Sequence, residues 1–160
     1  MAFLEWLQQS WLGRLVAESL WGYPTFETMH TIGMALLIGS LGLINLRVLG
    51  YKPELPLLGT RDLLPLAWLG FTINAISGAA LFASDAVNFF SSYTFWTKIV
   101  LVILGGINAA VLSSRIFGGG VAAPPTVGAR VIAASSLVFW MGAVVAGRLI
   151  AYTPPFGSIG

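Results

Sequence analysis

The chain has 160 residues, enough for one compact domain, but its composition excludes a soluble one. Hydrophobic residues make up 57% of the chain and charged residues 9%, against about 45–50% and about 25% in soluble domains. The net charge of +2 comes without any basic run, which argues against a nucleic-acid-binding surface. The absence of cysteine excludes disulfides, iron–sulfur clusters and cysteine nucleophiles. The composition therefore predicts an integral membrane protein.

Residues 1–24 form the first predicted element, an amphipathic helix that lies in the plane of the membrane interface. Leu4, Leu7 and Trp11 recur at helical spacing, while polar residues interrupt every apolar run. The three tryptophans of this segment are typical of side chains at headgroup depth. Pro24 is expected to separate this helix from the first span. A helix that packs against a partner subunit is the alternative.

Four apolar segments follow, and each has about the 20 residues that a helix needs to cross the hydrocarbon core of a bilayer. They cover residues 25–46, 63–83, 95–114 and 131–151. They must be helices, because lipid offers no hydrogen-bond partner to an unpaired backbone group and the alternating pattern of a barrel strand is absent. Proline, glycine and charge separate the segments, and the Pro/Gly tail at 153–160 cannot extend the last one. The predicted fold class is all-α, an integral membrane four-helix bundle over residues 25–152.

The distribution of Lys and Arg predicts the orientation of the bundle. The first and third connections, with their flanks, hold five of these residues: Arg47, Lys52, Arg61, Arg115 and Arg130. The opposite side holds three: Arg14, Lys98 and Arg148. Because cytoplasmic loops carry the excess of Lys and Arg, both termini are expected on the periplasmic side.

Small and polar residues within the spans are expected at helix–helix contacts. Lipid gives no hydrophobic drive for association, so close backbone approach and hydrogen bonds must hold the helices together. The small residues in question are Gly39, Gly42, Gly105, Gly106, Gly142, Ala143, Ala146 and Gly147. The residues expected to hydrogen-bond between helices are Asn45, Asn74, Ser77, Asn108, Ser135 and Ser136.

Each span brings an ionisable side chain to the same outer layer. These side chains are Glu27, Asp85, Lys98 and Arg148, with His30 beside them. A lone charge in a bilayer costs about 2.5–3.5 kcal/mol even on insertion scales, so we expect the four charges to form salt bridges in a protein-lined pocket. The alternative is that each side chain simply reaches the headgroups.

His30 is the only histidine of the chain, and Glu27, His30 and Met34 share one helical face. Imidazole and thioether suit copper, and His with Met also serves as an axial pair for haem. This pattern predicts a ligand set of His30, Met34 and Glu27, with His30 and Met34 as the candidate haem ligands. The supporting charged layer consists of Asp85, Lys98 and Arg148. Two alternatives stay open: His30 hydrogen-bonded to a carboxylate in a structural network, and methionines that only fill packing gaps.

Several kinds of enzyme are excluded. The glycine triplet at 118–120 lacks the strand and the Lys-Ser or Lys-Thr pair of a phosphate-binding loop. The helix of a zinc peptidase needs two histidines, and the chain has one. A serine hydrolase is excluded because this histidine lies in a span and no serine has a nucleophile elbow around it. No inverted repeat or broken pair of spans indicates a transporter. An activity of the chain on its own is not expected.

Two stretches, MHTIGMALLIGSLGLINLRVLG (29–50) and LFASDAVNFFSSYTFWTKIVLVILGGINAAV (81–111), resemble a family of bacterial inner-membrane proteins of unknown function. The similarity covers all four spans, although Asn45 stands where relatives usually have Asp. More distantly, the bundle is similar to the membrane part of copper-resistance D proteins and to four-helix b-type cytochromes. The resemblance implies a four-helix fold in the bacterial inner membrane.

Two hypotheses for function follow. The first is a binding or transfer module that holds copper or one b-type haem near the periplasmic face. The second is a non-catalytic accessory or anchoring subunit, or a homo-oligomer, in which the charged layer serves packing and the lipid bilayer and a periplasmic or membrane protein are the partners.

Overall fold

The computed structural model describes residues 1–118 and 124–153, and every regular element in these ranges is helical. Two short helices, α1 (Ala2–Gln8) and α2 (Trp11–Glu18), precede the first long helix. The four long helices are α3 (Gly22–Leu49), α4 (Leu63–Ser84), α6 (Tyr93–Phe117) and α7 (Val127–Leu149). A 3-10 helix, η1 (Leu58–Asp62), leads into α4, and the short α5 (Ala86–Phe90) joins α4 to α6. The predicted tail lies outside the described residues except for Thr153.

The predicted fold class is confirmed, because the structure contains four helices long and apolar enough to cross a membrane. The chain is a multi-pass membrane protein with four candidate spans. The helices α3 and α6 extend beyond the predicted spans at both ends, α4 ends one residue later than predicted, and α7 both begins and ends earlier than predicted. Local signals set several of these ends: Ser92 caps α6, Thr126 caps α7, and Gly50 closes α3 in the left-handed conformation at φ 104°.

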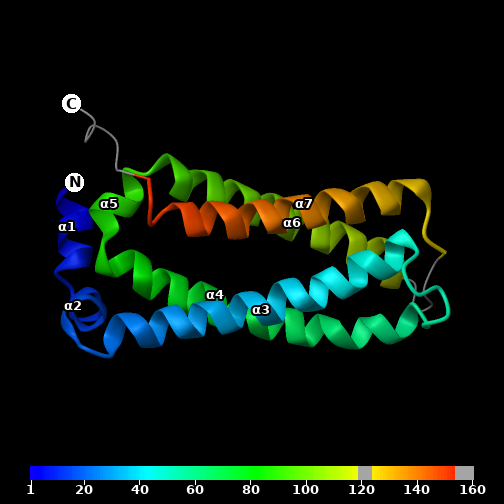
Figure 1. Ribbon diagram of the computed structural model, residues 1–160, viewed down its shortest axis with the longest axis horizontal. Coiled ribbons are helices and arrows are strands. Elements are labelled where there is room, and N and C mark those ends of the chain that lie inside the picture. The colour runs from blue at the N-terminus through cyan, green and yellow to red at the C-terminus, as the bar shows by residue number, and fades with distance from the viewer. Residues whose placement is uncertain (119–123, 154–160) are drawn as a thin grey trace.

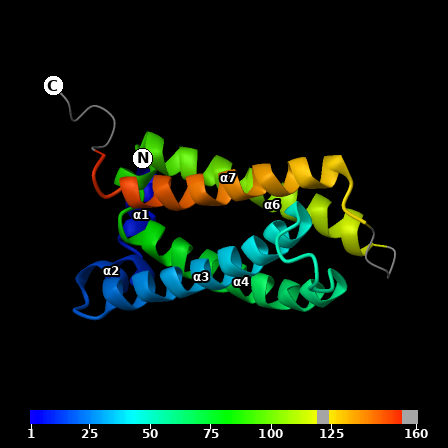
Figure 2. The same ribbon diagram turned by 45° about the vertical axis from the view of Figure 1, so that its right-hand side comes forward.

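The four long helices run up and down in two antiparallel hairpins. Helix α3 packs along α4, α6 packs along α7, and α3 against α7 joins the hairpins. Figure 1 shows the four helices side by side, and Figure 2 shows the same pairing from a second direction. We call the end at which α3 begins and α7 ends the α5 end, and the opposite end the η1 end. The first connection therefore lies at the η1 end, where α6 also ends and α7 begins, as predicted for neighbouring antiparallel helices.

The apolar core fills the η1 half of the bundle. Its buried members are Leu37, Leu41, Ile44, Val48, Ala67, Leu112, Ile116, Phe117, Ala129, Ala133 and Trp140. The indole of Trp140 lies against Gly105, where an added Cβ would meet the ring at 2.9 Å. Two of the predicted interhelical hydrogen bonds connect this half, Asn45 to Ser136 at 3.1 Å and Asn108 to Ser135 at 2.8 Å.

The N-terminal segment differs from the single helix predicted over residues 1–24. Ser10 accepts a hydrogen bond from the backbone N–H of Gly13 and starts a second helix there. Gly13 and Val16 are buried where α2 packs against the bundle. Pro24 lies inside the first turn of α3, where its missing N–H has no intrahelical partner to lose. The expected boundary at this proline is therefore wrong, and the two short helices cover the α5 end.

Candidate functional site

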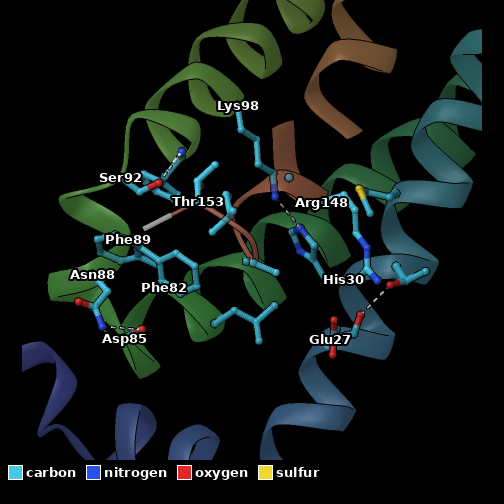
Figure 3. Close-up of a pocket in the computed structure, with 18 of the residues that line it drawn as sticks. Glu27, His30, Phe82, Asp85, Asn88, Phe89, Ser92, Lys98, Arg148 and Thr153 are labelled. Atoms are coloured by element: carbon cyan, nitrogen blue, oxygen red, sulfur yellow. Dashed lines mark hydrogen bonds between the residues drawn. The ribbon is translucent and has the colours of Figure 1, made fainter. Parts of the chain in front are cut away.

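A pocket opens at the α5 end, between the two hairpins. It has a volume of about 600 Å³, and its lining comes from α3, α4, α5, α6 and α7. Figure 3 shows its charged and aromatic side chains converging from these helices. The pocket contains Glu27, His30, Met34, Asp85, Lys98 and Arg148, so the structure brings together every residue of the predicted site.

A close crossing of α3 and α4 positions one wall of this pocket. Gly33 and Gly70 face each other so tightly that a Cβ at Gly33 would lie 2.7 Å from the backbone nitrogen of Asn74, and one at Gly70 would lie 2.5 Å from that of Leu37. Only glycine permits this approach of two backbones. One turn from Gly33, the crossing places the imidazole of His30 against Asn74 and Gly78.

His30 is held by hydrogen bonds on both ring nitrogens. Its Nδ1 lies 3.0 Å from the backbone oxygen of Asn74 and 3.2 Å from Oγ of Ser77. Ser77 already donates its hydroxyl proton to the oxygen of Ile73 at 2.6 Å. Nδ1–H must therefore be the donor in this cluster, because both of its neighbours act as acceptors. The lone pair of the ring then lies on Nε2.

Nε2 accepts a hydrogen bond from Nζ of Lys98 across the pocket, at 3.2 Å. The lysine stem packs against Gly147 of α7, where an added Cβ would lie 3.4 Å from both Cδ and Nζ. His30 of α3 therefore contacts two further helices, α4 through the backbone oxygen of Asn74 and α6 through Lys98. Figure 3 shows the contact between His30 and Lys98. The alternative of a hydrogen bond between His30 and a carboxylate is wrong, since its partners are amide, hydroxyl and ammonium groups.

The expected salt bridges among the four charges do not form. Asp85 accepts from the side chain of Asn88 at 2.9 and 3.1 Å. Arg148 lies 3.5 Å from the hydroxyl of Tyr152, over whose ring its guanidinium also sits. Asp85 and Arg148 thus find partners within their own stretch of chain, and Lys98 binds His30. Within the described ranges 1–118 and 124–153, no ion pair joins any two of the four charges.

Met34 lies one turn from His30 on the same helical face and lines the same pocket. Glu27 lies one turn from His30 in the opposite direction, and its side chain is exposed. Over the part of the chain that the structure describes, no three His, Cys, Asp or Glu side chains form a metal-binding group. The predicted ligand set of His30, Met34 and Glu27 lines one pocket from a single helix.

A cluster of aromatic rings forms the wall opposite α3, and the sequence analysis did not identify it. Phe82 of α4, Phe89 of α5 and Phe95 of α6 lie with ring centroids 5.3 to 6.3 Å apart. All three line the pocket. Their spacing along the chain crosses two helix boundaries, so no periodicity connects them. Asn74 and Ser77 were expected to hydrogen-bond between helices, and both do so. The sequence did not identify His30 as their partner, because that contact depends on how α3 and α4 cross.

Comparisons of the chain with protein-family models, with curated proteins and with solved structures find no match. The resemblance to the inner-membrane family therefore stays a prediction.

Proposed function

We propose that the chain is a small membrane-embedded binding module that holds a copper ion or one b-type haem at His30, in the pocket of the α5 end. The observation that carries this proposal is the orientation of the imidazole. Nδ1–H donates to the backbone oxygen of Asn74, which directs Nε2 and its lone pair toward the pocket.

This arrangement is the one that metal-binding histidines adopt. A ligating histidine donates its second ring N–H to a carbonyl or carboxylate, which fixes both the tautomer and the ring plane. In this pocket the carbonyl of Asn74 does so, and the close crossing at Gly33 and Gly70 keeps it in place. Nε2 accepts its hydrogen bond from Nζ of Lys98 in this structure, and a metal at Nε2 would take the place of that donor.

Met34 supplies a second soft ligand at the distance of one helical turn. Thioether and imidazole together suit copper, and either residue can serve haem iron as an axial ligand. The pocket, at about 600 Å³, lies in the range of ligand sites for small molecules and cofactors. Its wall of Phe82, Phe89 and Phe95 offers apolar surface to a flat group.

The test is an absorption spectrum with elemental analysis, on protein purified gently in detergent from its native membrane. We expect a Soret band or stoichiometric copper in the wild type, and its loss in His30→Ala. Met34→Leu should weaken or shift the signal. Met141→Leu is the matched control, because Met141 is 56% exposed and lies outside the pocket lining.

A colourless, metal-free wild type, or a metal content that His30→Ala leaves unchanged, would contradict the proposal. Retention of the signal in Met34→Leu together with its loss in His30→Ala would assign the second ligand to another group.

The site proposal extends to location: the α5 end faces the periplasm across a bacterial inner membrane. Support comes from the Lys and Arg residues, five of which lie toward the η1 end and three toward the α5 end. The cysteine-free chain allows a direct test with Tyr51→Cys and Tyr152→Cys, which replace exposed tyrosines at opposite ends. An impermeant maleimide added to whole spheroplasts should label position 152 and spare position 51. The reverse pattern would invert the orientation.

A second candidate function, the accessory or anchoring subunit, has an observation of its own. The sequence predicted Gly39, Gly42 and Gly106 at helix–helix contacts, but an added Cβ at each would meet nothing within 4 Å. These faces suit a neighbouring subunit. Substitution of Gly39 and Gly42 by Leu should dissociate a complex extracted in native lipid, without lowering the stability of the chain itself. An unchanged complex, or a chain that runs alone before substitution, would count against this function.

A further inference from the structure

We infer that the ligand of this pocket is an anionic amphiphile, a flat or apolar molecule whose carboxylate or phosphate pairs with Lys98. This inference rests on the proposed function, because it names the class of ligand that the same pocket takes. Between the two proposed ligands, it favours a porphyrin with its carboxylates over a bare copper ion.

The first argument is the charge at the level of His30. Lys98 carries its Nζ 3.2 Å from Nε2 of His30, which is a neutral partner, and no carboxylate in the described chain pairs with it. The lysine stem rests on Gly147 of α7, which holds the ammonium group at this level. Lys98 therefore brings a cation without a carboxylate partner to this depth of the pocket, and a further cation placed there would be repelled.

The second argument is the position of the carboxylates in the lining. Glu27 precedes His30 by three residues, which is about 4.5 Å along the helix toward the α5 end. Asp85 follows Gly78, the glycine in contact with His30, by seven residues or about 10 Å in the same direction. The carboxylate of Asp85 also accepts a hydrogen bond from the side chain of Asn88. The negative charges thus lie at the mouth and leave the cation at the level of His30 without a counter-ion.

The third argument is the apolar wall. The rings of Phe82, Phe89 and Phe95 pack against one another and face the pocket together with Leu81 and Val144. A small hydrated anion gains nothing from such a wall. A molecule with an aromatic or aliphatic body and an anionic group uses both features, because the body excludes water and strengthens the charged hydrogen bond.

The experiment compares two probes with the same ring, iron-free protoporphyrin IX, which carries two carboxylates, and its uncharged dimethyl ester. Both are titrated into the full chain in phosphatidylcholine nanodiscs, with empty nanodiscs as the background for partition into lipid. We expect the dicarboxylate to bind at least about tenfold more tightly than the ester, which is the range of one charge-assisted hydrogen bond. Lys98→Gln should remove that preference, Lys98→Arg should retain it, and Lys52→Gln, an exposed lysine at the η1 end, is the matched control.

Equal binding of the two probes, or a preference that survives Lys98→Gln, would overturn the inference. If Lys98→Gln does not fold, the probe pair on the wild type still decides the question, because equal binding of the two probes leaves the ligand without a charged contact. Nanodiscs that contain phosphatidylglycerol show whether the natural anion is a lipid headgroup or a free molecule. If this lipid competes with the dicarboxylate, the anion is a headgroup; if it does not compete, the anion is a free molecule.

Failure of the proposed function gives a different result. If copper or haem content does not depend on His30, the metal assignment falls, yet the iron-free dicarboxylate still tests Lys98. If the charge preference is absent but His30→Ala removes the metal, the metal site stands and the ligand class is wrong.

Discussion

The two halves of the bundle are built from the same four helices, but one half is a packed core and the other surrounds a pocket. In the η1 half, apolar side chains fill the space between the hairpins, and the polar groups Asn45 and Asn108 each find a serine on α7. In the α5 half, the same helices surround a pocket of about 600 Å³ lined by charged and aromatic residues. One half is closed by packing and the other is held open.

The contrast shows that the η1 half contributes mainly to the stability of the fold and that the α5 half holds the residues of the candidate site. Small residues let Trp140 close against Gly105 in the first half, whereas Gly147 makes room for a lysine stem in the second. The crossing of α3 and α4 at Gly33 and Gly70 lies between the halves, so it contributes both to the packing of the core and to the position of His30. A rigid, well-packed region next to a binding pocket keeps the side chains of the pocket in place. The predictions below test this division, from the largest expected effect to the smallest.

Trp140→Ala should lower the stability of the chain most, by about 3–5 kcal/mol, because it removes a large buried ring from the core of the η1 half. Ligand binding at the α5 end should persist in whatever fraction remains folded. Unfolding in mixed micelles, followed by circular dichroism, gives the free energy of unfolding. Val138→Ala is the control at a position 67% exposed toward the surroundings. If Trp140→Ala abolishes ligand binding under conditions in which all of the protein is folded, the two halves do not act independently.

Gly33→Ala should affect both halves together. The added methyl would lie 2.7 Å from a backbone nitrogen of α4, so the helices must separate, at about 1–3 kcal/mol in the free energy of unfolding. The same movement withdraws Asn74 from His30, and ligand affinity should fall. Gly39→Ala is the matched control, because nothing lies within 4 Å of its added methyl. Equal stability of the two variants would contradict the close crossing.

Asn45→Ala should cost about 1 kcal/mol, since it leaves the buried hydroxyl of Ser136 without its partner. The double variant with Ser136→Ala should recover part of this loss, because the orphaned group is then absent. A thermodynamic cycle of the four proteins measures the coupling. A coupling free energy of zero would show that the hydrogen bond contributes nothing to the η1 half.

Asp85→Asn should change the stability least, by less than about 0.5 kcal/mol. Its partner in the structure is Asn88, one turn away and exposed, and it makes no ion pair that the substitution could break. The same unfolding measurement serves. A loss of several kcal/mol would mean that this carboxylate pairs with a cation after all, as the sequence had suggested.

Much of the fold follows from sequence alone, because the bilayer leaves few alternatives to a hydrophobic segment of about 20 residues. The meeting of Glu27, His30, Asp85 and Lys98 at one end was also predictable, since up-and-down topology brings alternate helix ends together. The contacts within that layer were not. Whether Lys98 reaches a carboxylate or an imidazole depends on the rotation of α6 about its axis, which sequence periodicity does not determine.

The N-terminal segment shows a second limit. Proline is tolerated in the first turn of a helix, so Pro24 did not mark the boundary that its presence suggested. The break between α1 and α2 depends on the hydroxyl of Ser10 as a cap, a signal that the hydrophobic pattern obscures.

The most direct test of the central claim, that His30 presents Nε2 to a ligand, uses the fact that it is the only histidine of the chain. Nitrogen-15 labelling of the histidine ring gives an NMR spectrum of just two nitrogens in the full chain. We predict a protonated Nδ1 and an unprotonated Nε2, with the Nε2 resonance shifting or broadening on addition of haemin or copper. A ring protonated at Nε2, or two resonances that neither ligand changes, would contradict the account.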